Sequence, residues 1–198
     1  LGILIPEEYG GEGGSFTDAG VLFEELGRGP VPGPHISSGL VGSFAIMEGG
    51  TEEQKKDWLP RLAKGERSLV LAVTEADYSW WEEDVHLVAQ PSGGGFQLNG
   101  AKVYVMDAKA ATHLLCAVRS EDGGTVGLVI ISADAPGVTI RSLPGFAWHL
   151  SEITLENVAV AGSDVLGGSL NGGWDALQRA IAKTIPIMGA FQTGASQM

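Results

Sequence analysis

The spacing of the apolar residues changes twice along this chain, and this change constrains the fold more than any other feature. In the first third, apolar residues recur at helical intervals, as at Ala19, Phe23 and Leu26. From Ser68 onward, short apolar runs alternate with turn residues, and from Gly172 the helical interval returns. Helices followed by a block of strands and then a helix predict an α+β fold.

Two capping sequences mark the starts of helices in the first third. Ser15-Phe16-Thr17-Asp18 places a hydroxyl and a carboxylate where the first helical amides need acceptors, and Thr51-Glu52-Glu53-Gln54 is a capping box. Residues 36–47 are small and apolar, which is typical of a buried helix. We expect Gly27 and Gly29 to end the first helix.

The middle of the chain is typical of a β structure. Leu69-Val70-Leu71-Ala72-Val73 suits a strand buried on both faces, and Asn99-Gly100, between the apolar runs 96–98 and 102–105, predicts a hairpin turn. Further strands are expected over 86–90, 113–119, 125–131, 138–142 and 152–158. Short strands without helices between them predict a middle antiparallel β barrel or sandwich.

These patterns divide the chain into three parts. We expect an N-terminal helical domain over 1–67, a middle β-barrel domain over 68–168 and the start of a C-terminal helical bundle over 169–198. Pro60 is expected either to kink its helix or to open a new turn that Gly65 ends, and Pro186 is expected to interrupt the last helix. Because the chain lacks an initial Met and its last residues read as the middle of a helix, we expect it to be a piece of a longer protein.

The charge balance excludes one class of function. The chain carries 24 acidic and 12 basic side chains, a formal net charge of −12. A nucleic-acid-binding protein needs a basic surface to neutralise phosphates, so we expect no nucleic-acid partner. The chain also has no run of about 20 apolar residues that would span a membrane, and no basic segment typical of a signal peptide. We therefore expect a cytoplasmic protein without a membrane span.

The reactive side chains form no catalytic pattern by themselves. The single cysteine, Cys116, excludes an internal disulfide framework, and its apolar surroundings predict a buried, inert thiol. The four histidines lack metal-ligand spacing, so no metal site is predicted. The glycine runs at 10–14 and 93–95 lack the strand, helix and lysine context of a phosphate-binding loop.

The order of nine short segments adds information that composition does not carry. One of them is Leu98-Asn99-Gly100-Ala101-Lys102, and together they are spread over most of the length of the chain. The segments span residues 5–11, 23–28, 50–55, 59–66, 71–75, 98–102, 134–138, 156–160 and 165–167. In this order they resemble the acyl-CoA dehydrogenase family.

The resemblance implies an architecture and a reaction. Members have an N-terminal helical domain, a middle β barrel and a C-terminal four-helix bundle, and they use FAD to oxidise the Cα–Cβ bond of an acyl-CoA thioester. A carboxylate base removes the α proton, and flavin N5 accepts the β hydride. The resemblance places that base beyond Met198, so no catalytic residue is predicted in this chain. It also implies electron-transfer flavoprotein as the electron acceptor and a homo-oligomer, either a tetramer or a dimer.

The resemblance also implies where the cofactor-binding residues lie. In the segment 71–75, backbone groups at Leu71 and Val73 and the Thr74 hydroxyl would face the pyrimidine edge of the flavin, where donors stabilise the charge that grows on reduction. In the segment 102–106, Tyr104 would pack against the flavin, and Val105 and Met106 would pass near N4 and N5. In the loop 76–84, Ser79 would contact the pyrophosphate.

Three departures from the family pattern favour alternatives. Met106 stands where a threonine is usual, the loop 76–84 has no glycine, and Glu82, Glu83 and Asp84 add negative charge where phosphates would lie. A degenerate structural subunit that binds neither flavin nor substrate is therefore one alternative. A related flavin monooxygenase or nitroalkane oxidase is another.

Overall fold

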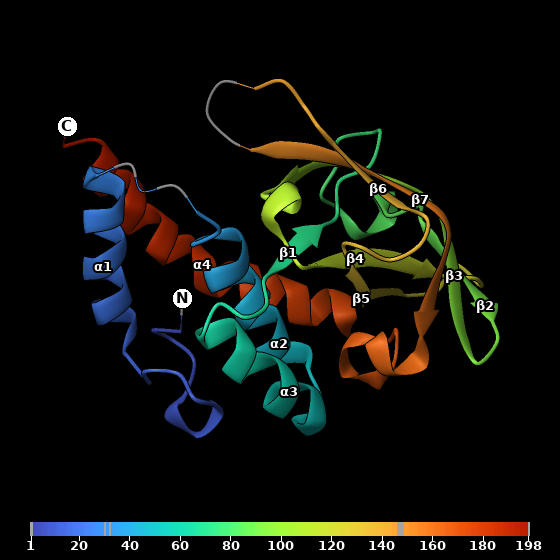
Figure 1. Ribbon diagram of the computed structural model, residues 1–198, viewed down its shortest axis with the longest axis horizontal. Coiled ribbons are helices and arrows are strands. Elements are labelled where there is room, and N and C mark those ends of the chain that lie inside the picture. The colour runs from blue at the N-terminus through green and yellow to red at the C-terminus, as the bar shows by residue number, and fades with distance from the viewer. Residues whose placement is uncertain (1, 30, 32, 146–148, 198) are drawn as a thin grey trace.

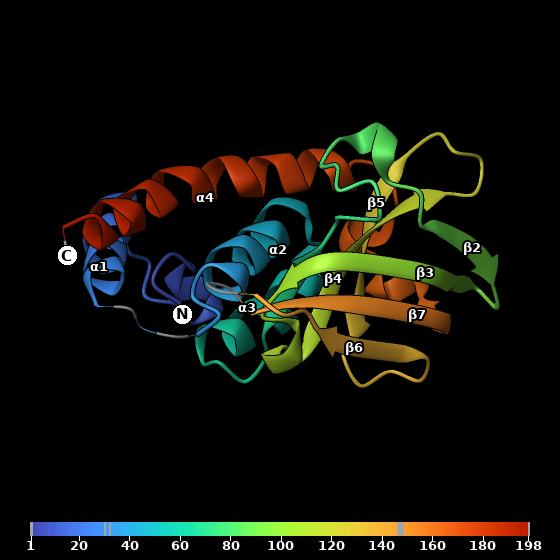
Figure 2. The same ribbon diagram turned by 90° about the horizontal axis from the view of Figure 1, so that it is seen from above.

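The computed structural model describes residues 2–29, 31, 33–145 and 149–197, and it has the predicted α+β class. Helices gather at one end of the molecule and a curled sheet at the other (Figure 1). The long helix α4 (Gly173–Ala195) extends from beside the sheet to α1 (Phe16–Arg28), as Figure 2 shows from above. No described helix is long and apolar enough to cross a membrane.

The N-terminal part has the predicted helices. After a short turn η1 (Glu7–Tyr9) come α1, a π-helical turn η2 (Ser37–Gly42), α2 (Ser43–Gly49) and α3 (Glu52–Ala63). Both predicted capping sequences are formed, since Ser15 accepts from the Asp18 amide and Thr51 accepts from the Gln54 amide, each reciprocally.

Two helix-ending predictions are wrong. Gly27 does not end α1 but lies buried inside it, and Gly29 caps the helix. Pro186 does not interrupt α4. A proline removes one helical hydrogen bond, here at the acceptor Ala182. Ala182 and Pro186 are both exposed, so solvent can satisfy the freed carbonyl while the opposite face of α4 stays packed.

Seven strands form one sheet. Their bounds are β1 (Leu69–Ala72), β2 (Val88–Ser92), β3 (Gly95–Met106), β4 (His113–Ser120), β5 (Val126–Ser132), β6 (Val138–Ser142) and β7 (Leu150–Ala161). The order is β1-β4-β2-β3-β7-β6, and β5 lies off this path, paired with β4 from His113 to Arg119. Short turns η3 (Glu82–Asp84), η4 (Ala108–Ala110), η5 (Gly162–Asp164) and η6 (Leu166–Gly168) connect the elements.

The sheet is mixed rather than wholly antiparallel, which corrects the predicted topology. β1 pairs with β4 in parallel, with Leu69 opposite His113 and Ala72 opposite Cys116, and β2 pairs with β4 in parallel as well. The antiparallel expectation came from turn signals between neighbouring strands. Those signals carry no information about β1 and β4, because β2 and β3 lie between them in the chain.

The predicted hairpin at Asn99-Gly100 is also wrong. β3 continues through both residues and pairs with β7, with a register shift between Leu98 and Gly100. The Asn99 side-chain oxygen accepts a hydrogen bond from the Asn157 amide at 2.8 Å, so the polar residue joins the two strands instead of turning the chain. The hairpin lies at Gly93-Gly94, where both glycines have positive φ.

The buried side chains form two clusters on opposite faces of β1 and β4. Leu69 and Leu115 pack against the helices, whereas Val70, Leu114 and Cys116 face the inside of the curled sheet. Alternating residues of one strand thus enter different cores. This confirms that the apolar run at 69–73 is buried on both sides.

Cys116 lies in the inner cluster with no exposed surface, and burial raises the pKa of its thiol to about 12. We expect a thiol reagent such as Ellman's reagent to leave Cys116 unmodified in the native protein at mildly alkaline pH, because the thiolate is the reacting form. Unfolding in guanidinium should release one reactive thiol per chain. Stoichiometric reaction without denaturant would contradict the buried position.

Candidate functional site

The two segments predicted to bind the cofactor lie side by side. Residues that follow β1 run along the middle of β3, where the Val103 amide donates a hydrogen bond to the Thr74 carbonyl oxygen at 2.8 Å. The Lys102 ammonium donates to the Val73 carbonyl oxygen at 3.1 Å. The fold therefore joins segments 71–75 and 102–106, although Lys102 and Glu75 are 27 positions apart in the sequence.

A buried ion pair holds this junction together. The Lys102 Nζ lies 2.6 Å from a Glu75 carboxylate oxygen, and the Lys102 side chain has no exposed surface. The Glu75 carboxylate also accepts from the backbone amides of His86 and Leu87 at 3.2 and 3.1 Å. Burial lowers the pKa of Lys102, and the charge of Glu75 opposes that shift. The pair thereby connects β1, β3 and the start of β2.

Tyr104 stands on a bulge of β3 next to this pair. The register between β3 and β7 shifts between Lys102 and Val105, and Tyr104 has a left-handed backbone with φ of 54°. Tyr104 is 49% exposed, and the centroid of its ring lies 5.5 Å from that of the Tyr78 ring, with the two planes tilted by 40°. Tyr78 also has a positive φ, of 63°. The bulge thus turns an aromatic side chain away from the core, where a ligand can contact it.

The other residues predicted to bind the cofactor differ in which of their groups could contact a ligand. Thr74 is nearly buried, and within the described chain its hydroxyl has no hydrogen-bond partner. Val73 and Val105 are buried, so only their backbone groups could reach a ligand. Leu71 and Met106 are half-buried, with Leu71 packed against the helical core.

Ser79 is already hydrogen-bonded within its own loop. Its hydroxyl donates to the Asp84 carboxylate and accepts from the Trp81 amide at 3.2 Å. Contact with a pyrophosphate, as predicted for Ser79, would replace the bond to Asp84. Trp80 and Trp81 beside it are exposed.

The acidic part of this loop forms the short turn η3. Arg119 binds it through the backbone, since its Nε donates to the Val85 carbonyl oxygen at 2.7 Å and its Nη2 donates to the Glu82 carbonyl oxygen. These bonds fix the turn without pairing the guanidinium to the Glu82 or Glu83 carboxylate. The negative charge noted in the sequence is therefore present at the surface of the loop.

Reasoning from sequence missed the roles of Glu75, Lys102 and Tyr78. One signal for Lys102 was its place in a strand pattern, since a lysine buried in a strand needs an anionic partner. The sequence carries no signal for the partner itself, because the choice of Glu75 depends on the register of β3 against the end of β1.

Comparison with protein-family models matches residues 1–66 to the acyl-CoA dehydrogenase N-terminal domain. A glutaryl-CoA dehydrogenase from Mycobacterium smegmatis, solved in complex with FADH2, superimposes with a TM-score of 0.88 at 25% identity. That alignment covers 100% of this chain and 51% of the other.

Curated relatives agree. Acyl-CoA dehydrogenase fadE12 of Mycobacterium tuberculosis (strain CDC 1551 / Oshkosh) is 31% identical over 147 residues, which are 69% of this chain and 37% of the relative. A 3-(aryl)acrylate reductase of Clostridium sporogenes (strain ATCC 15579) is 31% identical over 184 residues, which are 88% of this chain and 48% of the relative. The chain thus spans less than half the length of these two relatives. The order of its segments, its fold and these relatives together show that this chain belongs to the acyl-CoA dehydrogenase family.

Proposed function

We propose that this chain forms one wall of the flavin site in an FAD-dependent oxidoreductase that dehydrogenates an acyl-CoA thioester between Cα and Cβ. The observation that carries the proposal is the junction of segments 71–75 and 102–106 beside Tyr104. It is supported by the relatives named acyl-CoA dehydrogenase and by the similar fold of an enzyme solved with FADH2.

The residues at the junction fit a flavin in chemical type. Thr74 offers a hydroxyl without a partner in the described chain, and the exposed ring of Tyr104 offers an apolar face for a ring system. We propose that Thr74 donates to the pyrimidine edge, that Tyr104 packs on the ring and that backbone groups at Leu71, Val73, Val105 and Met106 line the remainder. FAD, when bound, supplies the hydride-accepting chemistry.

The remaining parts of the activity are proposals about the whole protein. We propose that the carboxylate base that removes the α proton lies outside residues 1–198, that electron-transfer flavoprotein reoxidises the cofactor and that the protein is a homo-oligomer. We also propose the division into 1–67, 68–168 and 169–198. The first boundary falls between α3 and β1, and the second falls between η6 and α4.

The loop 76–84 supports a second candidate, a degenerate structural subunit. Ser79 donates to Asp84, exposed Trp80 and Trp81 add bulk, and the loop carries carboxylates where the family resemblance would place phosphates. Negative carboxylates in this loop would repel a bound phosphate and so weaken its binding.

The visible spectrum of the purified full-length protein separates the two candidates. We expect a yellow protein with near-stoichiometric flavin that bleaches when an acyl-CoA thioester is added without oxygen. A colourless protein that takes up no added FAD would contradict the proposal and favour the structural subunit. Flavin that is bound but never bleached by any acyl-CoA would contradict the proposed reaction while leaving cofactor binding intact.

Thr74→Val tests the cofactor contact independently of turnover. Because one hydrogen bond is worth about 0.5–1.5 kcal/mol, we expect the dissociation constant for FAD to rise by about 2- to 10-fold, measured by quenching of flavin fluorescence in the apoprotein. Thr139→Val, at an exposed position on β6, is the matched control and should leave the constant unchanged. Equal affinities in both variants would remove Thr74 from the proposed site.

A further inference from the structure

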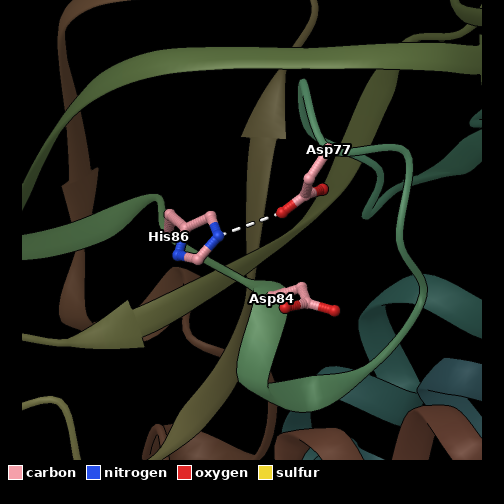
Figure 3. Close-up of side chains that lie close together, drawn as sticks. All are labelled: Asp77, Asp84 and His86. Carbon is pink, nitrogen blue, oxygen red and sulfur yellow. Dashed lines mark hydrogen bonds and ion pairs between the residues drawn. The ribbon is translucent and has the colours of Figure 1, made fainter.

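Three potential metal ligands converge at the base of the loop between β1 and β2. Asp77 follows β1, Asp84 ends the turn η3, and His86 precedes β2, and Figure 3 shows their side chains close together. We propose that Asp77, Asp84 and His86 form a binding site for a divalent transition-metal ion such as Zn²⁺. The site shares the loop 76–84 with Ser79, and its test needs no flavin.

The spacing of the ligand atoms suits one ion. His86 Nε2 lies 3.0 Å from Asp77 Oδ2, and the three ligand atoms all lie within 4.8 Å of one another. Two neighbouring ligands, each about 2.1 Å from a zinc ion, stand roughly 3.0–3.4 Å apart. The Asp77–His86 pair therefore already has ligand spacing, and Asp84 needs only a small side-chain movement to complete the set.

Contacts behind the ligands orient them. The second oxygen of Asp77 accepts from the Ser79 amide at 3.2 Å, and the Ser79 hydroxyl donates to the Asp84 carboxylate. The backbone amide of His86 donates to Glu75, which the buried Lys102 holds in place. Such outer contacts fix the direction of metal ligands and raise affinity.

The charge and accessibility of the loop favour a cation. The Asp77 and Asp84 carboxylates place two acidic groups beside the His86 imidazole. The His86 side chain is 63% exposed and that of Asp77 is 35% exposed, which gives an ion access from solvent. An imidazole beside two carboxylates favours Zn²⁺ over Ca²⁺ or Mg²⁺, which prefer oxygen ligands.

The test is a Zn²⁺ titration of chelator-treated full-length protein, followed by calorimetry and by tryptophan fluorescence. We expect one Zn²⁺ per chain, no comparable binding of Ca²⁺, and a change of emission, because Trp80 and Trp81 are exposed in the same loop. Asp77→Asn, Asp84→Asn and His86→Gln should each weaken Zn²⁺ binding by about tenfold or more. Glu83→Gln, an equal charge change in η3 outside the three ligands, should leave the affinity within about twofold.

Several outcomes would overturn the proposal. They are the absence of Zn²⁺ binding, binding that survives all three ligand substitutions, a Glu83→Gln variant that loses affinity as much as they do, and tighter binding of Ca²⁺ than of Zn²⁺. Circular dichroism and the urea midpoint of each variant check the fold, which these solvent-accessible positions should leave intact. Agreement among three separate variants keeps the conclusion independent of any one that fails to fold.

Discussion

Lys102→Met is expected to lower the free energy of unfolding by about 3–5 kcal/mol, because it removes one partner of a buried ion pair. Lys102 has no exposed surface and Glu75 has little, so the substitution leaves a carboxylate inside the protein without its counter-charge. The Val73 carbonyl loses a hydrogen-bond donor as well. Equilibrium unfolding in urea measures the change.

Two comparisons make this expectation specific to the pair. Lys102→Met combined with Glu75→Gln should be more stable than Lys102→Met alone, because no unpaired charge remains. Arg141→Met breaks the surface pair between Arg141 and Glu152, in which the Arg141 side chain is 66% exposed. This substitution should lower the free energy of unfolding by less than about 1 kcal/mol. A Lys102→Met variant that loses no more stability than Arg141→Met would show that the buried pair contributes little.

Gly194→Val is expected to cost about 3 kcal/mol or more, because α1 and α4 touch through their backbones at this point. A Cβ at Gly194 would overlap the carbonyl oxygen of Glu24 and lie 2.7 Å from its carbonyl carbon, closer than the 3.0 Å that real Cβ atoms keep. Gly27 on α1 is equally close to α4, because a Cβ built at Gly27 would overlap the backbone carbonyl oxygen of Phe191. A side chain here would therefore push the two helices apart.

Gly189→Val on the same helix is the matched control. No atom lies within 4 Å of a Cβ built at Gly189, so only helix propensity changes, and stability should stay within about 1 kcal/mol of the original. Thermal unfolding followed by circular dichroism compares the two variants. Equal melting temperatures would mean that α1 and α4 can separate at no cost and that the contact does not support the fold.

The local elements could be predicted because their signals are local. The capping sequences at Ser15 and Thr51 satisfy helical amides within three residues, so the sequence contains both partners of each bond. The apolar run at 69–73 indicated a strand buried on both faces, and it lies between the two cores. Resemblance to a known family, rather than spacing, pointed to Thr74 and Tyr104.

Two of the wrong predictions share a physical cause. Gly27 reads as a helix end, yet its missing side chain serves contact with α4, and Asn99-Gly100 reads as a turn, yet Asn157 from β7 pairs with it. In each case a partner that is distant in the sequence provides free energy that outweighs the local preference. Nothing within the local window identifies that partner.

The sequence by itself determined most helices and strands, the α+β class and the family. Apolar spacing, capping residues and segment order can each be read from residues that are neighbours along the chain. Only the tertiary structure decided that β1 and β4 run parallel, that Glu75 is the partner of Lys102, and that Asp77, Asp84 and His86 meet. These contacts depend on the register of strands and on the path of a loop. Register is set by the packing of both cores at once, so the residues that make the candidate sites become neighbours only when the whole sheet has formed.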